Sequence, residues 1–75
     1  CGIAVSGNLV FVCDFLNSRV SVFTTSGYFV RKWHACGYND RLHRPWGISV
    51  FKDLVVVTDP QTHRVSLFRC DGTFI

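Results

Sequence analysis

The 75-residue chain has no glutamate, no methionine and only two alanines. Because these residues are among the best helix formers, their scarcity argues against a helical protein. Eleven valines and seven phenylalanines favour β-strands instead. No apolar run approaches the roughly 18 residues of a membrane helix, and the first residues do not resemble a signal peptide. The composition therefore predicts one small all-β domain with no membrane segment.

The sequence also lacks a C-x-x-C pair, a zinc-finger spacing and an N-glycosylation sequon. Its four cysteines are expected to be free thiols in a reducing compartment, which predicts a cytoplasmic location; a secreted protein stays open as the alternative. Cys13 ends an apolar run and should be a small buried residue. A metal site of His34, Cys36 and His43 would need a fourth ligand, so neither a metal nor another cofactor is predicted.

The main positive feature of the sequence is an internal repeat. Shifted by 45 residues, the chain aligns with itself without a gap, and 13 of the 30 overlapping positions are identical. DFLNSRVSVF, which begins at Asp14, matches DPQTHRVSLF, which begins at Asp59. The chain thus contains one full unit and most of a second.

Turn residues divide each unit into short strands. The expected strands are 2–5, 9–13, 19–24 and 28–33 in the first unit, and 47–51, 54–58, 64–69 and the start of a fourth at Thr73 in the second. The first unit accordingly covers residues 1–33, the linker 34–46 and the incomplete second unit 47–75.

The strand 9–13, LVFVC, is apolar on both faces. A sheet with one solvated face should alternate instead, so we expect sheets that are covered on both sides. Four-stranded antiparallel blades stacked around an axis, as in a β-propeller, meet this requirement. Propellers close with about four to eight blades, so the chain is predicted to be a fragment that requires the remaining blades and would not fold stably alone.

Four stretches carry a family resemblance: PWGISV (45–50), VVVTD (55–59), THRV (62–65) and NSRV (17–20). The units resemble NHL repeats, with Thr62 in place of the usual asparagine and Ser18 in place of the usual histidine. The resemblance implies a six-bladed propeller. Functions in this family include protein-interaction or RNA-binding ends of ubiquitin ligases, extracellular sensor domains and one zinc-dependent lyase.

Alternating strand directions bring the loops 14–18 and 59–63 and the linker to one rim. Loops held by a rigid scaffold commonly carry function. The candidate binding residues on or beside this rim are Phe15, Lys32, Arg41, His43, Arg44, Trp46, Gln61 and His63. Basic and aromatic residues suit a protein interface, which we expect first, or single-stranded RNA. No catalytic motif is present, so a non-catalytic role is expected, with a zinc-dependent lyase as a distant third alternative.

Each unit also places an aspartate and an arginine across the same corner, as Asp14 with Arg19 and Asp59 with Arg64. These pairs could face a ligand, or they could be structural joints in which the carboxylate pairs with arginine and caps loop N–H groups. Their repetition on successive units favours the joint.

Overall fold

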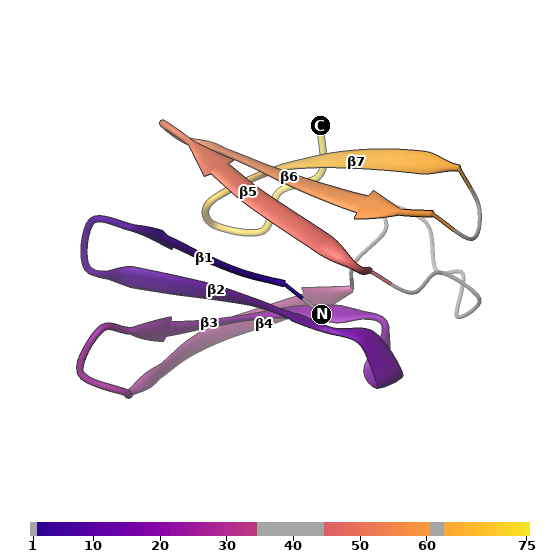
Figure 1. Ribbon diagram of the computed structural model, residues 1–75. Coiled ribbons are helices and arrows are strands. Elements are labelled where there is room, and N and C mark those ends of the chain that lie inside the picture. Colours follow the sequence, from indigo (N-terminus) through magenta and orange to yellow (C-terminus); the bar gives the residue numbers. More distant parts are fainter. Residues whose placement is uncertain (1, 35–44, 61–62) are drawn as a thin grey trace.

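The computed structural model describes residues 2–34, 45–60 and 63–75, which form two layered antiparallel sheets (Figure 1). Sheet A has the order β1 (Ile3–Ser6), β2 (Leu9–Asp14), β3 (Arg19–Thr24) and β4 (Phe29–His34), with a short 3-10 helix η1 (Phe15–Asn17) between β2 and β3. Sheet B has the order β5 (Gly47–Phe51), β6 (Leu54–Asp59) and β7 (Arg64–Arg69). The all-β prediction is confirmed at this level.

The strand limits agree with the expected ones to within one residue, with two differences of note. β4 extends through His34, which the sequence analysis assigned to the linker, because His34 pairs with Arg19 of β3. The fourth strand expected at Thr73 is only an isolated bridge between Phe68 and Phe74. Two hydrogen bonds make that bridge, from Arg69 N to the carbonyl of Thr73 at 2.8 Å and from Ile75 N to the carbonyl of Leu67 at 2.9 Å.

The 45-residue repeat is present in the backbone as well as in the sequence. Ile3 pairs with Val12 as Ile48 pairs with Val57, and the same correspondence runs through both sheets. Among the described residues, those with positive φ form three pairs at this spacing: Gly7 and Lys52, Ser18 and His63, and Gly27 and Gly72. Both units therefore turn their chains in the same way at the same positions.

The two sheets pack through different faces. Side chains alternate along a strand, and register partners share a face. The face of sheet A that carries Phe11, Cys13, Val20 and Val22 is called the front, and the opposite face is called the back. The same two terms apply to the equivalent positions of sheet B. The buried cluster joins the front of sheet A to the back of sheet B, where Val55, Val57 and Phe68 lie. Packing is therefore front on back.

The edge strand β4 of sheet A contacts sheet B. The Trp33 ring lies 5.7 Å from that of Phe68, and Arg31 Nη1 donates to the carbonyl of Cys70 at 2.9 Å. Gly72 follows β7 with a φ of 94°, and a Cβ there would come within 2.9 Å of Trp33. The turn after β7 thus needs glycine both for its backbone conformation and for its approach to the indole.

Candidate binding rim

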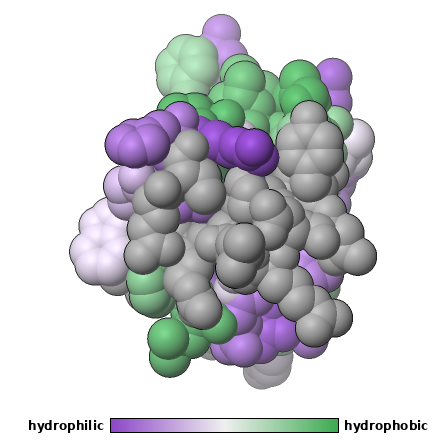
Figure 2. Space-filling model, turned by 90° about the vertical axis from the view of Figure 1, so that its right-hand side faces the viewer, coloured by the Kyte–Doolittle hydropathy of each residue, from purple (hydrophilic) through white to green (hydrophobic). Residues whose placement is uncertain are grey.

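The rim predicted from the strand order is one end of the molecule. The β2–β3 corner, the end of β4, the start of β5 and the end of β6 all lie there, at the right of Figure 1. Figure 2 looks onto this end, where hydrophilic surface lies beside hydrophobic surface that gathers along the upper edge, on the side of sheet B. The structure describes Phe15, Lys32, Trp46 and His63 of the candidate residues; Arg41, His43, Arg44 and Gln61 lie outside the described residues.

Two of the candidate residues are in contact. Phe15 belongs to η1 and Trp46 precedes β5, and their ring centroids lie 5.5 Å apart with an interplanar angle of 85°. Pro45 is fully buried beside Trp46 in the chain, and Trp46 itself is 55% exposed. The edge-to-face pair thus joins the two sheets at the rim and leaves much of the indole accessible.

A hollow of about 200 Å³ opens beside the end of β4. It is lined by Arg19, Lys32, Trp33 and His34. Lys32 and His34 stand on the back of sheet A, whereas Trp33 stands on the front, so the hollow wraps around the edge strand. Its volume is below the range of about 300–1,000 Å³ for small-molecule sites, which suits a single side chain or a small anionic group.

The indole nitrogen of Trp33 adds a polar group near the hollow. Trp33 Nε1 is buried and has no hydrogen-bond partner within the described part of the chain. A buried donor of this kind normally has a partner. It is therefore a group that an acceptor brought by a ligand could satisfy.

Asp14 moderates the positive charge of the rim. Arg19 Nε donates to Asp14 Oδ2 at 3.2 Å, and Asn17 Nδ2 donates to the same oxygen at 2.9 Å. The Asn17 hydrogen bond, followed by the contact with Arg19, lowers the pKa of Asp14. Asp14 thus offsets part of the positive charge of the hollow at Arg19, and Lys32 is the lining residue that favours an anionic ligand.

The same corner in the second unit has a different environment. Asp59 and Arg64 are register partners, as Asp14 and Arg19 are. Asp59 is buried because the back of sheet B is covered, whereas Arg64 is exposed. His63 is exposed and has a φ of 55°, close to the 52° of its counterpart Ser18. His63 thus presents its imidazole from a fixed left-handed position.

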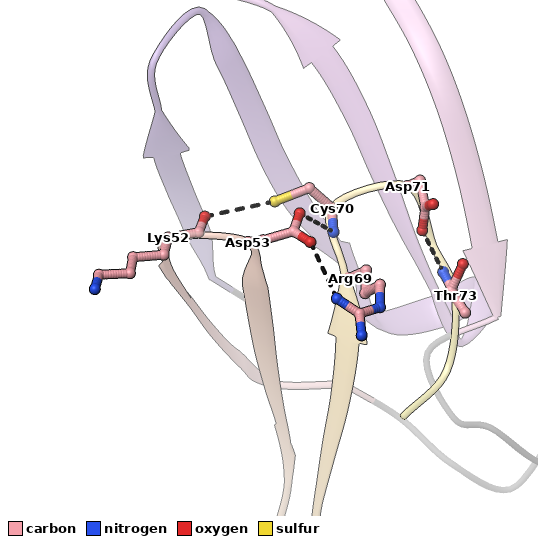
Figure 3. A network of polar contacts seen from close by, with 6 residues as sticks. All are labelled: Lys52, Asp53, Arg69, Cys70, Asp71 and Thr73. Atoms are coloured by element: carbon pink, nitrogen blue, oxygen red, sulfur yellow. Dashed lines mark hydrogen bonds and ion pairs between the residues drawn. The ribbon is translucent and has the colours of Figure 1, made fainter.

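The opposite rim is braced by its own polar contacts (Figure 3). Asp53 accepts hydrogen bonds from Arg69 Nη1 and from the backbone N–H of Cys70, both at 3.4 Å. Asp71 accepts from the backbone N–H of Thr73 at 2.9 Å. Burial, and then the neighbouring Asp53, raises the pKa of the Cys70 thiol. These carboxylates stabilise turns, so this rim is a poorer candidate for a ligand.

The sequence predicts Lys32 as a binding residue but does not group it with Arg19, Trp33 and His34. The available signal was the register: Arg19 lies opposite His34, and Ser21 lies opposite Lys32. Counting back from the turn at Ser26-Gly27 gives this register only if one residue of β4 is skipped. The bulge between Val22 and Phe23 shifts that count, and it is not visible in the residue pattern.

No protein-family model matches the chain, and no curated protein matches it. Among residues 2–34, 45–60 and 63–75, no helix is long and apolar enough to cross a membrane. Within the same ranges, no three His, Cys, Asp or Glu side chains gather in a group that could hold a metal ion.

Proposed function

We propose that the chain is part of an NHL-type β-propeller and serves as a non-catalytic platform for a protein partner. The repeated register and the front-on-back packing support the propeller, since blades stacked around an axis must each present one face to the preceding blade and the other to the next. The motif residues noted in the sequence support the family.

The hollow beside β4 is the observation that carries the binding role. It combines the basic side chains of Arg19, Lys32 and His34 with the Trp33 ring, and the exposed Trp46 lies on the same rim. Tryptophan and arginine are enriched at the energetically important points of protein interfaces. An acidic segment with an apolar side chain would satisfy both parts: its carboxylate pairs with Lys32 or Arg19, and its apolar group packs against an indole.

Single-stranded RNA is the alternative ligand. It would need a basic groove with several stacking platforms along it. The hollow has the size of one side chain, and the Asp14 carboxylate lies beside it. The small size favours a protein side chain over RNA, whereas the carboxylate acts against both anionic ligands.

The test is an NMR titration of the folded chain with an Asp-rich peptide containing one leucine, and in parallel with a U-rich RNA oligonucleotide. We expect the peptide to shift the Trp33 indole N–H resonance. Lys32→Glu should weaken peptide binding about tenfold, the loss expected for one charge-assisted contact. Lys52→Glu is the matched control, because this substitution makes the same change of charge on the opposite rim.

Three results would contradict the proposal. Equal losses for Lys32→Glu and Lys52→Glu would show that only net charge matters. RNA binding that is tighter than peptide binding and weakens steeply as salt rises would assign the rim to RNA. Failure of both ligands to shift the indole resonance would remove the site.

A further inference from the structure

The back of sheet A has the same residues as the buried back of sheet B. Six apolar positions on this face are identical in the two units: Ile3 and Ile48, Val5 and Val50, Val10 and Val55, Val12 and Val57, Phe23 and Phe68, and Phe29 and Phe74. The aromatic contact is also reproduced, with ring separations of 5.8 Å for Phe23–Phe29 and 5.6 Å for Phe68–Phe74. The two faces are therefore alike in residues and in arrangement.

Their burial differs greatly. In sheet B the face packs on sheet A, which leaves Val55 0% and Phe68 1% exposed. In sheet A, Ile3 is 65% and Val5 63% exposed, and no described element covers them. A continuous apolar face of this kind is typical of an interaction site. The equivalent face of sheet B packs against the apolar front of another sheet.

The required partner surface also exists on this chain, uncovered. The front of sheet A receives sheet B through Leu9, Phe11, Val20 and Val22, and the front of sheet B has Leu54, Val56, Val65 and Leu67 at the equivalent positions. Val65 is 64% exposed, and Phe51 at the edge of the same face is 66% exposed. The chain thus presents both halves of its internal interface on opposite outer faces.

We propose that a second copy of this chain docks the front of its sheet B on the back of sheet A, in the orientation in which sheet B packs on sheet A within one chain. The contact is heterologous, so each copy still offers one free face, and further copies add until the assembly closes into a ring or continues as a filament. Thr58 stands where the internal interface has Cys13, so this contact is weaker than the internal one.

Two single substitutions test the arrangement. Val5→Glu places a charge on the back of sheet A, and Val65→Glu places one on the front of sheet B. Both residues are mostly exposed in the single chain, so the chain's own fold loses little, whereas a glutamate buried in the contact has no partner. Sedimentation velocity should show association of the unsubstituted chain that rises with concentration. Each substitution alone should weaken it more than about tenfold.

Mixing the two variants gives the decisive result. The Val65→Glu chain retains an intact back and the Val5→Glu chain an intact front, so the mixture should form a 1:1 pair and nothing larger. If each variant is unfolded alone, titrating one with the other should restore the β-sheet circular dichroism signal. The signal should stop rising at equal concentrations of the two variants. Tyr28→Glu is the control, because Tyr28 is exposed in the β3–β4 turn; this variant should associate as the unsubstituted chain does.

Other results would overturn the proposal. A monomeric unsubstituted chain at all concentrations would do so. Dimers of Val65→Glu alone would indicate a back-to-back contact, which does not use the front of sheet B. A mixture that neither pairs nor regains structure would exclude the head-to-tail contact. Neither Val5 nor Val65 lines the hollow, so each substitution can abolish self-association without removing a residue that binds the peptide.

Discussion

Sheets A and B share a register and the residues of their back faces, but not their surroundings. Val10 is partly exposed in sheet A, whereas its counterpart Val55 is fully buried in sheet B. The aspartates differ likewise: Asp14 is partly exposed, whereas its counterpart Asp59 is buried. A residue's contribution to stability therefore depends on the layer beside it, since burial of apolar area supplies most of the stabilising free energy.

The largest effect should come from removing a ring on the covered face. Phe68→Ala is expected to lower the free energy of unfolding by about 3–5 kcal/mol, because Phe68 is buried against Trp33 and Phe74. Phe23→Ala, its counterpart on the open face, should cost only about 1 kcal/mol. Urea unfolding followed by circular dichroism at low protein concentration measures both.

Equal losses for the two alanine variants would show that the covering sheet does not determine the cost of losing the ring. A concentration series extends the test. If a second copy covers the back of sheet A, Phe23 becomes a buried residue at high protein concentration, and the loss for Phe23→Ala should approach the loss for Phe68→Ala.

Two glycines with the same backbone conformation provide a smaller effect. Gly27 and Gly72 have φ values of 98° and 94°, so alanine costs each about 1–2 kcal/mol in backbone strain. Only Gly72 faces the Trp33 ring, while a Cβ on Gly27 meets nothing within 4 Å. Gly72→Ala should therefore cost about 1–3 kcal/mol more than Gly27→Ala in thermal or urea unfolding. Indistinguishable losses would show that the turn after β7 shifts away from Trp33 without cost.

The smallest effect is the dependence of stability on acid pH. Asp14 has a pKa lowered from its ordinary value of 3.8, first by the Asn17 amide and then by Arg19, and Asp71 has one lowered by Thr73. The folded carboxylates hold protons less tightly than the unfolded ones. Their stabilising contributions are thus present above about pH 3.8 and are lost as the pH falls through the lower folded values.

Asp14→Asn, in the first unit, should reduce the loss of unfolding free energy as the pH falls. Asp71→Asn is the matched change in the second unit. Both are measured by urea midpoints between neutral and acid pH. A curve that stays as steep in both variants would place the acid sensitivity on other carboxylates.

Much of the architecture could be predicted from the sequence because it follows from local rules. The 45-residue identity showed that both units have the same strands, and the turn residues Gly7 and Gly27 marked the hairpin ends correctly. The expected proximity of Asp14 and Arg19 followed from the short corner between β2 and β3, and their side chains lie 3.2 Å apart. The sequence also indicated Cys13 as a buried residue, which it is.

What could not be predicted depends on contacts between the sheets. The approach of Gly72 to Trp33 and the bond from Arg31 to the Cys70 carbonyl join residues about 40 positions apart and have no sequence signature. The hollow beside β4 likewise depends on the bulge and on the edge position of that strand. Strands apolar on both faces indicated sheets covered on both sides, whereas each described sheet has one covered face.

The front-on-back contact also bears on how such a chain can lengthen during evolution. A DNA segment encoding 45 residues contains both sides of the contact, whichever point in the repeat is its start. Its tandem duplication therefore adds a unit whose two faces already match its neighbours, and no new complementary pair has to arise. An isologous contact offers no such route, because it joins the same face of two copies and leaves no complementary face for a third. The polarity of the stack thus makes the number of units easy to change by a single genetic event.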